Sequence, residues 1–457
     1  MKALSPTDSA FLWMETRSQP MHVAGLNLYT PPPGSGPNFV SHMVAEWRKH
    51  VKAQGIFNRR PVLRFGVWYW DEDSEFELDY HLRHLALPQP GRIRELLALT
   101  SRIHGNLLDR SRPLWEAYVI EGLPGGRFAT YIKMHHALID GVSGARMTAE
   151  GMSEDRHVLK PPLWAQTFKS RVPRAKVRED NKPGLMAQLV ELAAAGRELL
   201  PGVGEGLADM ARALSGQQTA YPVLQAPPTV LNVEISGARR FAAQSYSLAR
   251  LKRIGAAADA TVNDITLAIC AGALRTYLAT HATLPDKPLT AMVPVSLHDD
   301  STGEGNQVTL LLAELGTHIA DPLKRLASIK ASTTRAKDKL RSMSRLKKMA
   351  YGATSVATQG PSMMMPGLME KLSSKYPPFN VIISNVPGPR ESLYLDGAHL
   401  DEIYPVSIPT HFLALNITIS GYRDHLGFGY TACRRSVPAL QRMLDYTDQS
   451  IRELEAS

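Results

Sequence analysis

Apolar and polar residues alternate in two short stretches before the middle of the chain. The sequence WEAYVIEGLPGGRFATYIKMHH predicts two strands, over 115–121 and 127–134, and its Pro-Gly-Gly run at 124–126 predicts the turn between them. Every second residue from Phe128 to His136 shares one face of the second strand, because side chains alternate along a strand. That face is the more apolar of the two, and it ends at His136.

Further periodic segments follow in the second half of the chain. Apolar residues recur at helical spacing over 262–281, and strand-like runs occupy 289–297, 379–388 and 413–422. Helices and strands therefore mix in both halves of the sequence. This mixture predicts an α/β (α+β) fold with two domains of similar size.

A proline-rich segment separates the two halves. Residues 153–230 contain many prolines and a basic stretch, with helical apolar spacing over 185–200 and 207–214. Since prolines interrupt both helices and central strands, we interpret this segment as a helical, proline-rich connector. The expected organisation is an N-terminal domain over 1–152, the connector, and a C-terminal domain over 231–457.

Length and composition agree with this division. A chain of 457 residues is too long for one ordinary hydrophobic core, and its 44% hydrophobic and 21% charged residues are typical of globular proteins. No run approaches the roughly 20 apolar residues of a membrane-spanning helix. Pro6, Asp8 and Glu15 interrupt the stretch that would be apolar in a signal peptide, so we expect a cytoplasmic protein. Cys270 and Cys433 are expected to be buried free thiols.

The formal net charge of +9 favours anionic partners. Between Lys324 and Lys348 there are ten Lys or Arg residues and one acid, Asp338, and apolar residues recur there at helical spacing. This pattern predicts a basic amphipathic helix. Its charged face is either simply solvated or contacts anionic lipid or the phosphates of coenzyme A.

The segment HHALIDG, residues 135–141, is the strongest candidate for chemistry. A histidine at a strand end with apolar neighbours can stay neutral near pH 7 and act as a general base, which is the role that we assign to His136. Asp140 and Gly141 predict a tight turn, because Asp tolerates turn geometry and Gly accepts a positive φ. The adjacent His135 points to the opposite face of the strand.

Other classes of site fit the sequence less well. His135 and His136 are poorly placed to bind one ion, and no second Cys or His cluster has ligand spacing, so no metal site is expected. The chain contains no GxSxG elbow, no P-loop and no GxGxxG fingerprint after a strand. Serine hydrolases, nucleotide hydrolases and dinucleotide-dependent enzymes are therefore disfavoured.

The chain resembles the bacterial wax ester synthase/acyl-CoA:diacylglycerol acyltransferases over nearly its whole length. The matching landmarks, in the family's order, are LSPTDSAFLWMETRSQPMHVAGL (4–26), RPLWEAYVIEGL (112–123), KMHHALIDGVSG (133–144), TVNDITLAICAGALR (261–275), VPVSL (293–297) with GNQV (305–308), ISNVPGP (383–389) and YPVSIPTHFLALNITISGY (404–422). A single motif would be weak evidence, but seven landmarks in register are specific.

The resemblance implies a fold similar to chloramphenicol acetyltransferase, with two related domains and an active-site tunnel between them. It implies acyl-CoA as the donor substrate, no cofactor, and a long-chain alcohol or diacylglycerol as the acceptor. The products would be wax ester or triacylglycerol. No nucleic acid is implied as a partner, and the expected location is the cytoplasm, including the surface of the inner membrane or of lipid inclusions.

A thioester needs no covalent enzyme intermediate, so the reaction requires a base, an oriented pair of substrates and a stabilised oxyanion. His136 would take the acceptor proton and pass it to the departing thiolate. His135 either supports the loop or is an ordinary structural polar residue. By resemblance, Asp140 pairs with an arginine and holds the loop.

Residues of the second half complete the expected site. Asn263 is the candidate that polarises the thioester carbonyl, with the alternative that Asn263 or Asp264 simply caps the following helix. Ser384 and Asn385, together with Gly141 of the motif, are expected to bind substrate.

Two other functions remain open at this point. One is a condensation-type enzyme, which shares the HHxxxDG pattern but uses acyl groups on carrier proteins. The other is a non-catalytic scaffold of lipid inclusions that binds through 324–348 and the Met-rich run at 363–369. The preferred acceptor, the acyl length and the oligomeric state do not follow from the sequence.

Overall fold

The computed structural model describes residues 1–168, 226–297, 307–342 and 377–457. Four sequence expectations lie outside these residues, namely the helices expected at 185–200 and 207–214, the Met-rich run at 363–369 and the end of the basic helix beyond 342.

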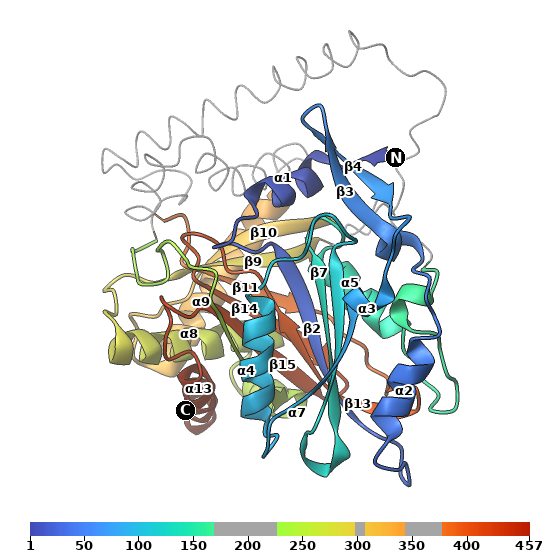
Figure 1. Ribbon diagram of the computed structural model, residues 1–457. Helices are drawn as coiled ribbons and strands as arrows, with labels where there is room; N and C mark the ends of the chain where they lie inside the picture. The colour runs from blue at the N-terminus through green and yellow to red at the C-terminus, as the bar shows by residue number, and fades with distance from the viewer. Residues whose placement is uncertain (169–225, 298–306, 343–376) are drawn as a thin grey trace.

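Two six-stranded sheets form the framework of the described chain (Figure 1). The first contains, in order across the sheet, β12 (Tyr394–Leu395), β13 (Ala398–Val406), β2 (His22–Thr30), β7 (Phe128–His135), β6 (Trp115–Glu121) and β5 (Leu82–Ala86). The second contains β10 (Gln307–Glu314), β9 (Thr290–Leu297), β11 (Val381–Val386), β14 (Leu415–Tyr422), β15 (His425–Cys433) and β8 (Arg239–Ser247). A small third sheet has the order β1 (Lys2–Ala3), β4 (Val67–Glu72), β3 (Arg59–Arg64).

Helices surround these sheets. The described helices are α1 (Pro6–Met14), α2 (Phe39–Trp47), α3 (Leu78–His81), α4 (Ile93–His104), α5 (Gly141–Glu150), α7 (Leu248–Ala257), α8 (Val262–His281), α9 (Pro322–Ser342) and α13 (Arg442–Ala456), with 3-10 turns η1 (Gly55–Asn58), η2 (Pro124–Gly126) and η3 (Leu163–Ala165). Helices α7, α9 and α13 all pack on α8, while α4 packs on β8 of the second sheet. Helix α4 thus ties the first half of the chain to the second.

The predicted mixed α/β fold is confirmed, and so are its most periodic elements. Strand β6 and helix α8 begin and end at the predicted residues, and β7 is shifted by one residue from 127–134. Helix α8 is buried on nearly every side, as its apolar sequence requires. Cys270 and Cys433 are buried free thiols, as expected.

The two sheets do not follow the order of the two halves of the sequence. Strand β13, from the last quarter of the chain, pairs antiparallel with β2 and so belongs to the first sheet. It also lies against β15 of the second sheet, where a Cβ on Gly427 would come within 2.1 Å of the Ile403 carbonyl oxygen, and a Cβ on Gly429 within 2.1 Å of the Pro405 carbonyl oxygen. Glycine at both positions lets β13 join the sheets.

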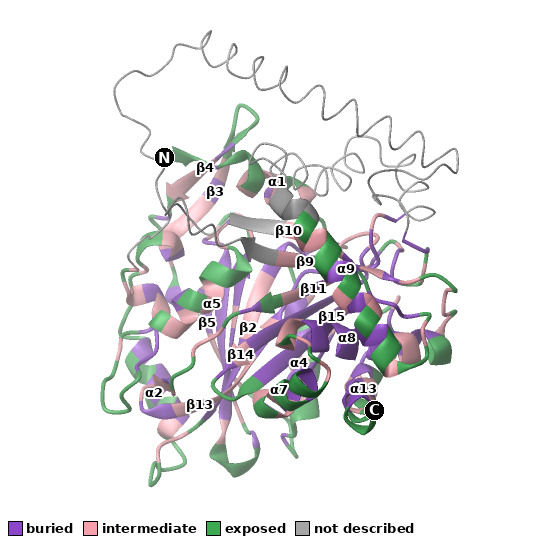
Figure 2. Ribbon diagram, turned by 180° about the vertical axis from the view of Figure 1, so that it is seen from behind, coloured by how far each residue is buried: buried purple, intermediate pink, exposed green. Residues whose placement is uncertain are grey.

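The central strands of both sheets are largely buried, while outer helices such as α7 and α9 expose one face (Figure 2). The largest apolar cluster packs α8 between the second sheet and the helices around it. A separate cluster joins Phe241 and Ala243 of β8 with Leu96 and Leu97 of α4, so the seam between the two halves has a core of its own.

Helix α9 confirms the amphipathic helix predicted from Lys324 onward, as far as Ser342. Part of its positive charge is already neutralised within the protein. Arg325 is buried and donates to two backbone carbonyls just before the helix, Lys330 pairs with Asp259 at 2.8 Å, and Arg335 lies 3.8 Å from Glu314.

Within the described residues, no single helix is long and apolar enough to cross a membrane. The bent pair α7 and α8, with an angle of 97° between its helices, passes the same test by length and composition alone.

Candidate active site

The HHALIDG loop is fixed at both of its ends. Strand β7 ends at His135, and the next amide, that of His136, donates to the Met21 carbonyl at 2.8 Å. At the other end, the Asp140 carboxylate caps α5 by accepting from the Ser143 amide at 2.9 Å and from its hydroxyl at 2.7 Å. The intervening backbone thus holds His136 between the end of a central strand and a helix N-terminus.

The imidazole of His136 is held in an apolar environment. Its ring stacks on Phe11, with centroids 4.1 Å apart and planes inclined by 26°. Burial lowers the pKa of His136, and the positive influence of His135 lowers it further, while Asp140 and Asp8 partly oppose this shift. A histidine with a lowered pKa is neutral near pH 7 and can accept a proton.

The two ring nitrogens of His136 differ in their surroundings. Nδ1 is buried and makes no hydrogen bond to any part of the chain that the structure describes. The residue's own backbone carbonyl raises the pKa of the ring, so it favours a proton on the imidazole. With a proton on Nδ1, Nε2 is the nitrogen that can accept another.

His135 is fully buried and serves the backbone of the same loop. Its Nδ1 accepts from the Ala137 amide at 3.0 Å, which leaves Nε2 as the nitrogen that carries a proton. That nitrogen faces Glu15, with Nε2 3.4 Å from Oε1. Glu15 in turn accepts from the Met21 amide at 3.0 Å, next to the carbonyl that binds His136.

Arg110 completes this buried chain of contacts. Its guanidinium donates to the Glu15 carboxylate at 3.1 Å and to the Leu12 carbonyl at 2.9 Å. Burial alone would raise the pKa of Glu15, but His135, the Met21 amide and Arg110 together outweigh it and hold the pKa below its usual range. The carboxylate is therefore ionised and keeps the His135 ring oriented.

Helix α1 supplies one whole side of this site, which the sequence analysis missed. Asp8, Phe11, Leu12 and Glu15 recur at spacings of three or four residues and so lie on one helical face. Asp8 acts on the His136 charge, Phe11 stacks on its ring, and Leu12 packs in one apolar cluster with Ala137. The helical spacing within LSPTDSAFLWMETR was the available signal.

The expected arginine partner of Asp140 is not found among the residues described. There the carboxylate caps α5 instead, which also fixes the loop. The first residue of α5 is Gly141, which is exposed.

The structure separates the two alternatives for the start of α8. Thr261 is the N-cap and forms a capping box with Asp264, whose carboxylate accepts from the Thr261 amide at 3.1 Å. Thr333 also donates to Asp264. Asn263 is therefore not the cap, and it is half-buried.

Ser384 and Asn385 lie on β11, which runs beside α5. Ser384 is half-buried and Asn385 is exposed. The following turn lies tight against the next strand, since a Cβ on Gly388 would come within 1.6 Å of the Gly421 carbonyl oxygen. The second sheet thus places these residues next to the helix that follows HHALIDG.

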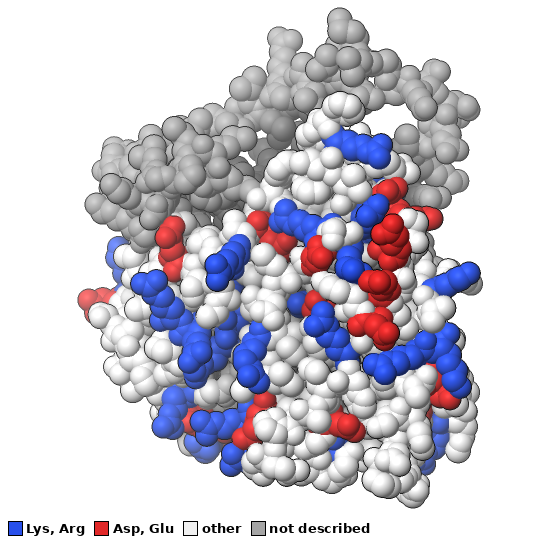
Figure 3. Space-filling view, in the orientation of Figure 1, with Lys and Arg blue, Asp and Glu red and all other residues white. Residues whose placement is uncertain are grey.

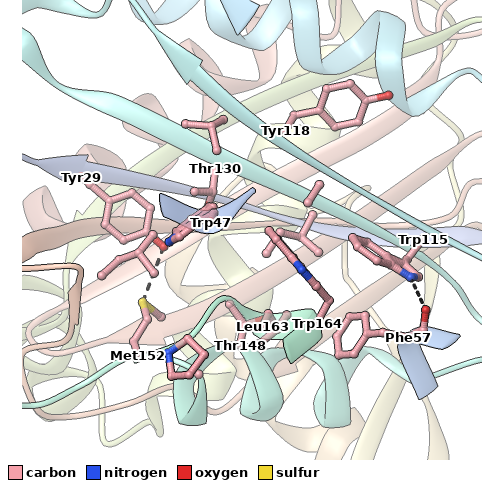
Figure 4. A pocket seen from close by; sticks show the side chains of 16 residues that line it. Tyr29, Trp47, Phe57, Trp115, Tyr118, Thr130, Thr148, Met152, Leu163 and Trp164 are labelled. Carbon is pink, nitrogen blue, oxygen red and sulfur yellow. Dashed lines mark hydrogen bonds between the residues drawn. The ribbon is translucent and has the colours of Figure 1, made fainter. Parts of the chain in front are cut away.

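A narrow apolar cavity lies on the other side of α5, between this helix and the first sheet (Figure 4). Trp115 and Trp164 stack in its wall with centroids 5.8 Å apart, and Thr148 and Met152 contribute from and just after α5. The Trp115 indole nitrogen donates to the Phe57 carbonyl at 2.8 Å, so the wall presents aromatic carbon. Trp115 is 1% exposed and lines this cavity.

Across the ranges that the structure describes, no three His, Cys, Asp or Glu side chains come together as metal ligands. His135 and His136 are bound to different partners, with Glu15 and Ala137 beside the first and Phe11 beside the second.

Comparison with known proteins gives a consistent family. The profile of the wax ester synthase/diacylglycerol acyltransferase catalytic domain matches residues 4–266, and that of the WS/DGAT C-terminal domain matches residues 304–455. The chain is 43% identical over 465 residues to a protein of Mycobacterium tuberculosis named as a diacylglycerol O-acyltransferase, covering 100% of this chain and 99% of the relative. It is 40% identical over 460 residues to O-acyltransferase WSD of Acinetobacter baylyi, covering 100% and 97%.

Solved structures agree with these sequence matches. The wax ester synthase/diacylglycerol acyltransferase of Marinobacter aquaeolei superposes with a TM-score of 0.79 at 38% identity, covering 100% of this chain and 99% of that one. The first condensation domain of the calcium-dependent antibiotic synthetase superposes with a TM-score of 0.56 at 13% identity, covering 99% and 95%. The second match concerns the fold alone.

Proposed function

Since the chain belongs to the wax ester synthase/diacylglycerol acyltransferase family and is an O-acyltransferase, we propose that it transfers a fatty acyl group from acyl-CoA to a long-chain alcohol or to diacylglycerol. The products are a wax ester or triacylglycerol, and free coenzyme A is released. The names of the relatives support both acceptors.

One observation carries the catalytic part of the proposal, namely the neutral, stacked His136 ring at a loop fixed from both sides. In the proposed reaction, Nδ1 keeps its proton and Nε2 accepts the proton of the acceptor hydroxyl. The hydroxyl oxygen then forms a bond to the thioester carbon. As the tetrahedral intermediate collapses, the C–S bond breaks and the imidazolium returns the proton to the thiolate.

The remaining site residues have supporting roles in this proposal. Asn263, whose amide is not used for helix capping, donates to the oxyanion. His135, Glu15 and Asp140 hold the loop, and Ser384 and Asn385 line the donor path beside α5. The apolar cavity behind α5 accommodates a methylene chain, since its wall is aromatic carbon.

Substitution of the base tests this function. With acyl-CoA and either hexadecanol or diacylglycerol, His136→Ala is expected to lower ester formation by about 10²–10⁴-fold, the usual contribution of general-base catalysis. His42→Ala, in the exposed part of α2, is the matched control and should keep full activity. Full ester synthesis by His136→Ala would refute the assignment, and wild-type protein that releases no coenzyme A would refute the acyl-CoA donor.

A further inference from the structure

A basic groove opens at the seam between the two halves of the chain. Its walls come from residues 16–18 after α1, residues 101, 102, 105 and 106 at the end of α4, residues 236–239 at the start of β8, and Arg434 after β15. The charged residues in the wall are all arginines, at positions 17, 102, 239 and 434, and no Asp or Glu of the described chain lines it. The groove belongs to neither the apolar cavity nor the His136 loop.

One of these arginines is built into the floor of the groove. Arg239 is 4% exposed and donates to the Ser18 carbonyl at 2.9 Å and to the Ser236 carbonyl. Burial lowers its pKa to about 10, so the guanidinium stays charged at neutral pH. It links the loop after α1 to the second sheet and leaves a positive charge beneath the groove.

The other three arginines have free charges. Arg17, Arg102 and Arg434 are exposed and pair with no carboxylate in the part of the chain that is described. By contrast, Arg92 at the opposite end of α4 pairs with Glu95 at 2.7 Å. Figure 3 shows Lys and Arg gathered over the face around α4, with few acidic side chains among them. Converging unpaired cations repel one another and favour a bound polyanion.

The groove is close to the catalytic loop along the chain. Residues 16–18 line it, while Glu15 and Met21, on either side of them, hold His135 and His136. From Ser18 to Met21 the backbone can span at most about 11 Å, and the Met21 carbonyl oxygen is 2.8 Å from the His136 amide. The pantetheine arm of coenzyme A is long enough to cover this separation.

We propose that this groove binds the phosphate groups of the acyl-CoA donor, with Arg102 and Arg434 on its two walls and Arg239 in its floor. The inference rests on the proposed function and names the donor's anionic part as the ligand of this groove. Helix α9 is the poorer candidate, because Arg325, Lys330 and Arg335 already have partners within the protein.

Assays with two acyl donors, one with and one without the nucleotide phosphates, distinguish a phosphate-binding groove from a purely structural role of its arginines. In Arg102→Ala/Arg434→Ala, the KM for acyl-CoA should rise about tenfold or more with kcat nearly unchanged, since a hydrogen bond to a charged group typically supports such a factor. With the same acyl group on pantetheine, which lacks the nucleotide and its phosphates, the variant and the wild type should behave alike. Arg92→Ala, on the same helix outside the groove, is the control and should change neither KM.

Several results would overturn the proposal. An equal loss with both donors would indicate a structural defect, and an unchanged KM for acyl-CoA would refute the phosphate contact.

Binding of adenosine 3′,5′-bisphosphate, measured by calorimetry, should be present in the wild type and weakened in the double variant. This result is expected even if acyl transfer itself is not observed. If the double variant loses binding to phosphatidylglycerol vesicles while the KM for acyl-CoA is unchanged, the groove binds lipid head groups instead.

Discussion

At the scale of single residues, a balance between burial and charge sets the pKa of His136. Burial and His135 lower its pKa, whereas Asp140 and Asp8 raise it. The neutral imidazole is the active form, so activity is retained below the ordinary histidine pKa of about 6.5 and is lost as the pH falls through the lowered value. The acid limb of the pH–rate profile thus reports the pKa that its surroundings give to the His136 imidazole.

Asp8→Asn tests this balance. Removal of the carboxylate removes an influence that raises the pKa of His136, so the pKa falls and the acid limb of kcat/KM moves to lower pH. The maximal rate above this limb should change little. Asp445→Asn, in the corresponding first turn of α13, is the control and should leave the profile in place. A shift to higher pH in Asp8→Asn would contradict the electrostatic account.

At the scale of elements, α1 acts as a support for the catalytic loop through Phe11, Leu12 and Glu15. Arg110 donates to the Leu12 carbonyl near the C-terminal end of this helix and to the Glu15 carboxylate just after it. A single contact network therefore connects the position of a surface helix to the orientation of His135.

Glu15→Gln should weaken this network while keeping a side chain of nearly the same size and shape at position 15. Gln still accepts from the Met21 amide but carries no charge for His135 and Arg110. We expect kcat to fall about tenfold, in proportion to one lost charged hydrogen bond, with a smaller change in KM. The loss in stability should be about 1–3 kcal/mol, less than for a fully buried pair because Arg110 is 35% exposed.

The stability effect of Glu15→Gln should also depend on pH. Because folding lowers the pKa of Glu15, its carboxylate stabilises the protein above the unfolded value of about 4.3, and this is lost as the pH falls through the folded value. The difference in Tm between wild type and variant should therefore shrink in acid. Glu150→Gln, which breaks an exposed pair with Arg146, is the control and should change Tm little at any pH. An equal Tm for wild type and Glu15→Gln at neutral pH would exclude the network.

Local patterns predicted the elements, and long-range contacts decided how the site is built. The alternation before His136 and the apolar spacing of 262–281 predicted β7 and α8, because each depends on its own residues. The placement of α1 against the loop depends on Arg110, which is far away in sequence. The resemblance gave the family, but the capping role of Asp264 needed the observed side-chain bonds.

At the scale of the whole molecule, strand β13 joins the two halves, in addition to the packing of α4 on β8. The connector over 153–230 was the expected boundary, yet β13 returns from beyond residue 390 to pair with β2. Its backbone lies so close to β15 that Gly427 and Gly429 have no room for a side chain. This contact could not be predicted from the segment LGFGYTAC, because its two glycines are required only by the close approach of β13, which is distant in the chain.

Gly429→Ala should therefore weaken the contact between β13 and β15 without changing any residue of the His136 loop. An added Cβ would lie 2.1 Å from the Pro405 carbonyl oxygen, which is backbone and cannot rotate away. Overpacking of this kind costs about 1–3 kcal/mol, so we expect a lower Tm. Because the groove and the site both use residues from the two halves, ester synthesis should fall as well. Gly25→Ala, where the nearest atom to the added Cβ is 3.9 Å away, is the matched strand control and should be close to neutral. If Gly429→Ala kept the wild-type Tm and activity, β13 would not be the element that fixes the two sheets together.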